Sequence, residues 1–141
     1  MKEIPRTCRL YHDLEWALKV GPGLKDFESA RKAVDERFTV MHAANTPNNA
    51  CLTVFGLMLG EGDFTKTIGT VIAMGLDNDC TGATAGSIIG AIVGRSGIPD
   101  HWTKNFNDKV RTYMIGYPEF SIEDLISRYV IQALTAMKNI K

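Results

Sequence analysis

Two aspartates separated by a single residue stand near the middle of the chain. Asp77 and Asp79 lie in the run 75–82, GLDNDCTG, between two apolar segments. Two carboxylates held close in a partly dry loop repel each other, and a divalent cation relieves that repulsion. Carboxylate oxygens suit magnesium, manganese or calcium better than zinc. The loop therefore predicts a cation site with Asp77 and Asp79 as ligands.

Three other interpretations of this loop depend on its neighbouring residues. In the first, Asp79 caps the following helix while Asp77 faces water. The second is an EF-hand loop, which fails because its twelfth position requires a bidentate Glu and holds Ile88. The third is a haloacid-dehalogenase-like phosphatase, whose Asp-x-Asp-x-Thr motif the run 77–81 matches literally. This interpretation is disfavoured, because such enzymes need a parallel sheet and the sequence downstream of the motif predicts helices.

Helices are expected on both sides of the acidic loop. Residues 49–59 are almost wholly apolar, which predicts a central helix buried on most sides. Asp63 stands where an N-cap would begin a helix over 64–74, and Gly75 is placed to end it. After the loop, a helix over 81–94 carries glycines four residues apart, so a neighbouring element can approach that face closely.

The remaining segments also have mostly helical spacing. Amphipathic helices are predicted over 7–20 and 24–38, with a looser helical pattern over 102–114. Ser121 followed by Asp124 indicates a capping box that opens a helix reaching Lys138. No alternating strand pattern of convincing length was found. The prediction is an all-α fold of about seven helices, forming a single helical domain over 1–141.

Composition narrows the classes of function. The chain has 141 residues, 45% hydrophobic and 23% charged, which is typical of one globular domain. Sixteen basic and sixteen acidic residues balance, so neither nucleic acid nor a membrane surface is expected as a partner. The three cysteines are far apart, and no apolar stretch has the length of a signal peptide core or a membrane span. The cytoplasm is the predicted location.

A longer stretch around the acidic loop resembles the C-terminal signature of the ADP-ribosylglycohydrolase family. The family form is Gly-x-Asp-Thr-Asp-Thr-x-Gly-Ala, then a helix of small residues, Ile-Pro and a Trp. The resemblance covers about residues 45–128, and residues 1–40 form a helical segment outside it. The matching runs are GLDNDCTGATAGSIIGA at 75–91, Ile98-Pro99, Trp102, NNA at 48–50, GEGDF at 60–64 and GYPEFSI at 116–122.

The resemblance implies an all-α hydrolase that holds two Mg²⁺ or Mn²⁺ ions. These ions bind the ribose of an ADP-ribosyl group and activate a water, which cleaves the glycosidic bond to a modified protein or other acceptor. Asp77 and Asp79 match the metal-ligating aspartates and are the expected catalytic residues. The family's hydroxyl ligand falls on Cys80, which would ligate through its carbonyl, or with Thr81 in its place.

The resemblance also implies that part of the metal site lies elsewhere. Family members carry a Gly-Asp element and a Thr-Asp-Asp-Thr-like element near the N-terminus, and residues 1–44 contain neither. We therefore expect the chain to correspond to the C-terminal part of the fold. A homodimer or a partner chain would supply the remainder by covering apolar faces of the helices at 49–59 and 81–94. The alternative is a noncatalytic remnant or subunit that dimerises or binds a nucleotide-like ligand.

Overall fold

The computed structural model describes residues 2–138 and divides the chain into two compact units, Met1–Pro99 and Asp100–Lys141. The single domain predicted over 1–141 stays a prediction. Within the described residues there are six α-helices, short 3-10 turns and one two-stranded sheet. The first unit holds the helices α1 Arg9–Val20, α2 Phe27–Arg37, α3 Thr46–Gly60, α4 Phe64–Met74 and α5 Asn78–Val93.

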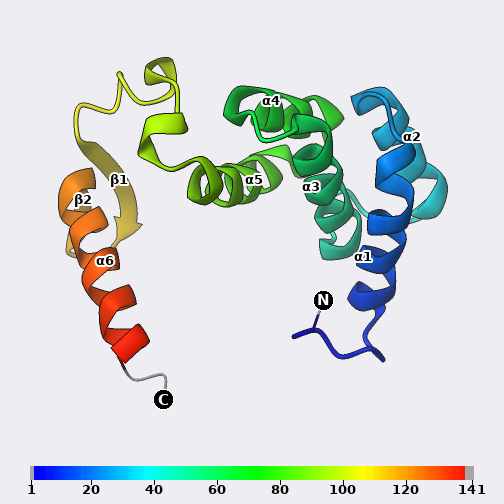
Figure 1. Ribbon diagram of the computed structural model, residues 1–141, viewed down its shortest axis with the longest axis horizontal. Helices are drawn as coiled ribbons and strands as arrows, with labels where there is room; N and C mark the ends of the chain where they lie inside the picture. Colours follow the sequence, from blue (N-terminus) through cyan, green and yellow to red (C-terminus); the bar gives the residue numbers. More distant parts are fainter. Residues whose placement is uncertain (1, 139–141) are drawn as a thin grey trace. The chain divides into compact units, whose positions relative to one another are not determined.

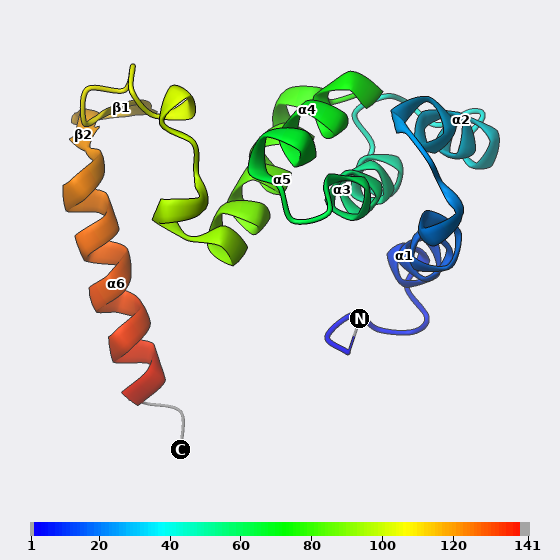
Figure 2. The ribbon, with the colours of Figure 1, turned by 45° about the horizontal axis from the view of Figure 1, so that its top comes forward.

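Helix α3 is the centre of the first unit. It lies between α1 and α2 on one side and α4 and α5 on the other (Figures 1 and 2). Leu52 and Phe55 on α3 are fully buried, together with Val34 on α2 and Val71 on α4. The central helix predicted from the apolar run is therefore confirmed. The expectation that α3 exposes an apolar face is wrong, because its four neighbours in the first unit cover it.

Helices α4 and α5 pack closely along the predicted glycine face. A Cβ added at Gly82 would lie 2.7 Å from the Ile72 side chain, and one at Gly86 would lie 3.5 Å from Ile68. The absence of side chains at these positions lets the larger residues of α4 approach the axis of α5. Gly94 has another role: it ends α5 with a positive φ of 67°, which favours glycine.

Local signals set the ends of α4 as expected. The Asp63 carboxylate accepts a hydrogen bond of 2.6 Å from the backbone N–H of Lys66, so it caps the helix. At the other end, Gly75 has a φ of 74°. The helix over 64–74 was therefore predicted with its observed bounds.

The second unit contains a hairpin where a helix was predicted. Strands β1 Lys109–Met114 and β2 Tyr117–Ser121 are antiparallel, and Gly116, with a φ of 81°, lies in their turn. The prediction of a helix over 102–114 and of a strand-free fold is wrong. Both faces of the hairpin are largely exposed, so its sequence lacks the apolar alternation that marks a half-buried strand. Residues 2–138 hold no parallel sheet, which removes the phosphatase interpretation.

Helix α6, Ile122–Lys138, follows the hairpin directly. The Ser121 hydroxyl accepts from the Asp124 N–H at 3.2 Å, as the capping signal predicted. The same hydroxyl donates to the Asp108 carboxylate at 2.6 Å, and that carboxylate also accepts from the Glu123 N–H. These donors hold the pKa of Asp108 below its ordinary value. The hairpin thus fixes the first turn of α6.

Thr67 on α4 provides a test of the packing between α3 and α4. Its side chain is fully buried, and its hydroxyl has no hydrogen-bond partner among the described residues. Removing an unpaired buried hydroxyl while keeping the shape of the side chain is favourable. Thr67→Val should raise the free energy of unfolding in urea by about 1 kcal/mol. The exposed Thr39→Val is the control, and a loss of stability in Thr67→Val would show that the hydroxyl is paired.

Candidate metal centre at the start of helix α5

The acidic loop lies at a sharp change of direction between α4 and α5. Gly75 and Leu76 both have positive φ angles, 74° and 62°, and α5 begins at Asn78. Arg31 on α2 donates to the Met74 carbonyl at 2.7 Å, which fixes the end of α4 just before the turn. The backbone therefore brings the two aspartates to the N-terminal end of α5, where the helix dipole favours negative charge.

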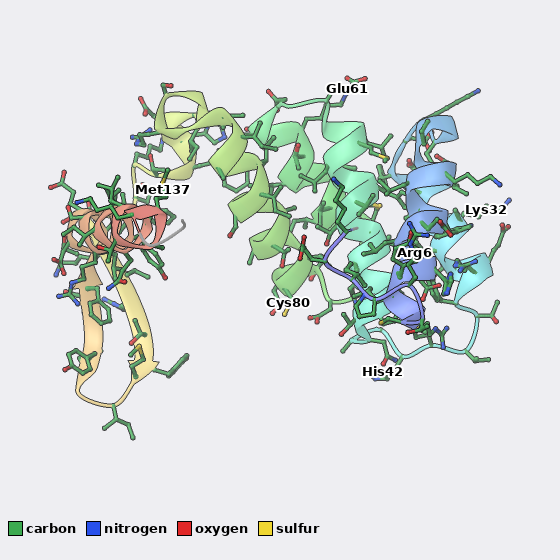
Figure 3. The ribbon with its side chains drawn as sticks, turned by 60° about the horizontal axis from the view of Figure 1, so that its bottom comes forward. Arg6, Lys32, His42, Glu61, Cys80 and Met137 are labelled. Carbon is green, nitrogen blue, oxygen red and sulfur yellow. The ribbon has the colours of Figure 1, made fainter. Side chains whose placement is uncertain are left out.

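Three side chains converge at this end of α5. One ligand atom each from Asp77, Asp79 and Cys80 lies within 4.8 Å of the others. Asp77 is half-buried, and Asp79 and Cys80 are exposed; Figure 3 labels Cys80 at this end of the helix. Asp77 occupies the N-cap position without a side-chain capping bond, and Asp79 follows in the first turn. The interpretation of Asp79 as the helix cap is therefore wrong.

The Cys80 thiol interacts with both aspartates. A hydrogen bond to the Asp77 carboxylate, followed by the negative charges of Asp77 and Asp79, raises the pKa of the thiol above its ordinary value. The protonated thiol donates to Asp77 and is a poor ligand for magnesium. The role of Cys80 as a ligand, through its carbonyl, stays a prediction.

Thr81 provides a hydroxyl one residue further along. Its side chain is buried, and the hydroxyl donates to the Asp77 carbonyl at 3.2 Å. Donation uses the hydroxyl hydrogen and leaves the oxygen lone pairs able to accept. Thr81 also lines the hollow beside the aspartates. Of the two positions that follow Asp79, Thr81 is therefore the one whose side chain has an oxygen with lone pairs available to a cation.

Asn49 on α3 connects the acidic loop to the core. Its side-chain oxygen accepts from the Asp77 N–H at 3.2 Å, across 28 positions of sequence. Its side-chain nitrogen donates to the carbonyls of Ala43 and Asn45 at 2.6 and 2.8 Å. Asn49 is itself buried, and its three bonds are part-buried. This residue holds Asp77 in place, a role that the sequence analysis did not assign.

A hollow of about 270 Å³ lies between the start of α3 and the start of α5. Polar side chains from both helices line it, and several of these were absent from the predicted site. The sequence offers one signal for them, since the pair Asn48-Asn49 opens an otherwise apolar helix. The lining residues are Ala44, Asn45, Thr46, Asn49, Ala50, Thr53, Asp77, Cys80, Thr81 and Thr84.

The donor set fits one divalent cation better than two. Magnesium is commonly held by one or two carboxylates and keeps several waters, which Asp77 and Asp79 at an exposed helix end allow. A pair of ions needs about six ligands each, with carboxylates from several elements. Within residues 2–138, Asp77, Asp79 and Cys80 form the acidic and cysteine cluster of metal-binding spacing. The residues present therefore suit one hydrated Mg²⁺ or Mn²⁺ ion.

The pKa of Cys80 gives a test of the cluster in metal-free protein. Asp77→Asn removes the anionic acceptor, so the Cys80 pKa should fall toward its ordinary value and the thiolate fraction at fixed pH should rise. Alkylation by iodoacetamide at pH 8 in EDTA, in a Cys8→Ser background, should be roughly threefold faster. The rate-versus-pH midpoint should move to lower pH. Glu15→Gln on α1 is the control, and an unchanged midpoint in Asp77→Asn would contradict the contact.

These features define a mostly helical protein with a candidate cation site at a helix N-terminus. The profile of the ADP-ribosylglycohydrolase family matches residues 2–135, nearly the whole chain. The chain therefore belongs to the ADP-ribosylglycohydrolase family. No curated protein and no solved structure matches it. Among the helices of residues 2–138, none is both long and apolar enough to cross a membrane.

The family match is longer than the resemblance found in the sequence. It begins at residue 2, so it includes residues 1–40 almost entirely, which the sequence analysis left outside. Their two helices, α1 and α2, pack on α3 and complete the core of the first unit. Their contribution is hydrophobic packing, which carries no short motif.

Proposed function

We propose that this protein takes part in the metal-dependent hydrolysis of the glycosidic bond of an ADP-ribosyl adduct. Membership of the ADP-ribosylglycohydrolase family supports the class of reaction. The observation that carries the proposal is the convergence of Asp77, Asp79 and Cys80 within 4.8 Å, beside a polar hollow. The substrate would be a small ADP-ribosyl compound or a modified protein.

The proposed roles follow from the position of each residue. Asp77 and Asp79 would hold Mg²⁺ or Mn²⁺, and the Thr81 hydroxyl is the third candidate ligand from this chain. A cation held there would act as a Lewis acid toward the ribose hydroxyls and a bound water. Asn49 is a positioning residue, because it acts on the site through the backbone of Asp77.

We further propose that a second chain completes the site. Two carboxylates and one hydroxyl leave most of the coordination positions of a two-ion centre to other groups. A second copy or a separate partner would supply them. The alternative function is a noncatalytic subunit. It is favoured by Cys80, because a thiol whose pKa is raised stands at the position of a hydroxyl ligand in the family pattern. The cytoplasm stays the predicted location.

An activity assay tests this proposal. The purified protein would be incubated with an ADP-ribosylated peptide and Mg²⁺ or Mn²⁺, with release of ADP-ribose measured. Metal-dependent release should fall at least a hundredfold in Asp77→Asn/Asp79→Asn and stay unchanged in Glu15→Gln/Glu28→Gln, which also removes two exposed carboxylates. Release that is equal in the aspartate variant would reject the roles of Asp77 and Asp79. Absent release would reject catalysis by copies of this chain alone, leaving the noncatalytic subunit or a site completed by a separate partner.

A further inference from the structure

The apolar side chains of α6 form a continuous exposed stripe. Residues at steps of three or four share one face of a helix. Ile126, Val130, Leu134 and Met137 follow this spacing, and each is at least half exposed, with Val130 at 51%. We call these four residues the α6 stripe; Figure 3 labels Met137 on this helix. No residue of α6 is buried within the described chain.

The hairpin of the second unit leaves the stripe uncovered. Leu125, which is half-buried, follows the hairpin on α6 and lies about 140° around the helix from Val130 at 100° per residue. The short contact of α6 with β2 is at the start of the helix, near Ser121. An exposed apolar stripe of this length on a soluble helix marks an interaction surface.

The charged residues at the two ends of the α6 stripe favour a second copy of α6 as its partner. Glu123 lies on the same face at the N-terminal end of the stripe, and Lys138 directly follows its C-terminal end. In an antiparallel pair of α6 helices centred on Val130, Ile126 is level with Leu134 of the second copy. Glu123 is level with Met137 and therefore one position from Lys138. The two helix dipoles also oppose each other favourably. A parallel pair would instead place like charges together.

We propose that α6 pairs antiparallel with α6 of a second copy of this chain, with Val130 on the two-fold axis. Val130 then lies opposite Val130 and Ile126 opposite Leu134, and at each end Glu123 lies one position from the partner's Lys138, close enough for an ion pair. Asp124 is already paired with Arg128 within the helix at 2.9 Å, so Glu123 is the acidic residue left for the partner. The α6 stripe shares no residue with the acidic loop, and the pairing does not depend on the proposed function.

Sedimentation of the full chain tests the pairing. A dimer is expected at micromolar concentration, and Val130→Glu should weaken it at least tenfold, because two carboxylates would meet at the axis. Gln132→Glu adds the same charge away from the stripe and should leave the dimer intact. Glu123→Lys or Lys138→Glu alone should weaken it, and the two together should restore it. A monomer, or a dimer that Val130→Glu leaves unchanged, would overturn the proposal.

Disulfide crosslinking tests the direction of the pair. In a Cys8→Ser/Cys80→Ser background, Val130→Cys should form an intermolecular disulfide under mild oxidation. Ile126→Cys should not, because two copies of residue 126 lie eight positions apart along antiparallel helices, about 12 Å at 1.5 Å per residue. Crosslinking at both positions would indicate parallel helices, and crosslinking at neither would reject the contact. Both results contradict the proposal.

Discussion

Phe55→Ala should lower the free energy of unfolding of the first unit by about 4 kcal/mol. Phe55 is fully buried at the centre of α3, and its ring meets that of Trp16 on α1 at a centroid distance of 5.6 Å. The substitution removes this burial and leaves a cavity among helices that cannot collapse fully around it. Total stabilities of about 5–15 kcal/mol make this a large fraction of the whole.

Urea unfolding followed by circular dichroism measures this loss. Phe106→Ala is the matched control, because Phe106 is 53% exposed and its removal should change stability by less than about 0.5 kcal/mol. A loss in Phe55→Ala no larger than that of the control would show that α3 is not the centre of the packing.

Asn49→Leu should destabilise the same unit by about 3 kcal/mol and loosen the acidic loop. Leucine is similar in size but cannot accept from the Asp77 N–H or donate to the carbonyls of Ala43 and Asn45. The loss of stability comes from the backbone N–H and carbonyl groups that are left without a hydrogen-bond partner. Because Asn49 positions Asp77, Mn²⁺ affinity should also fall, by roughly tenfold, the lower end of the effect of removing residues that support metal ligands.

Two measurements separate these effects. Urea unfolding gives the stability, and calorimetry at a temperature where the variant is fully folded gives the affinity. Asn105→Leu, at an exposed position in the second unit, should change neither. If Asn49→Leu lost stability but bound Mn²⁺ as tightly as the unmodified chain, Asn49 would be structural alone.

Sequence patterns predicted the helices of the first unit because their signals are local. Asp63 and Gly75 set the bounds of α4. The nearly continuous apolar run within α3 indicates a helix that is buried on most sides. The hairpin was not predicted because both of its faces are largely exposed. Residues 109–121 therefore need no regular alternation of apolar and polar side chains. The contacts of α1 and α2 with α3 depend on tertiary packing, which a motif search does not detect.

The candidate site shows the same division between local and distant information. Asp77 and Asp79 were found because two carboxylates in a short apolar-flanked loop are a local pattern. Asn49 was missed as a positioning residue because its bond to Asp77 spans 28 positions and depends on how α3 meets the loop. The raised pKa of the Cys80 thiol was also not predicted, because it depends on how close the side chains of Asp77 and Asp79 lie to the thiol.

Calorimetric titration of Mn²⁺ and Mg²⁺ into the purified chain tests the central claim most directly. Asp77→Asn/Asp79→Asn removes both carboxylates of the cluster, and Glu15→Gln/Glu28→Gln is the control of equal charge. We predict saturable binding of one ion per chain, lost in the aspartate variant and kept in the control. A folded chain that binds neither ion, or binds equally in all three forms, would contradict a metal centre at the start of α5.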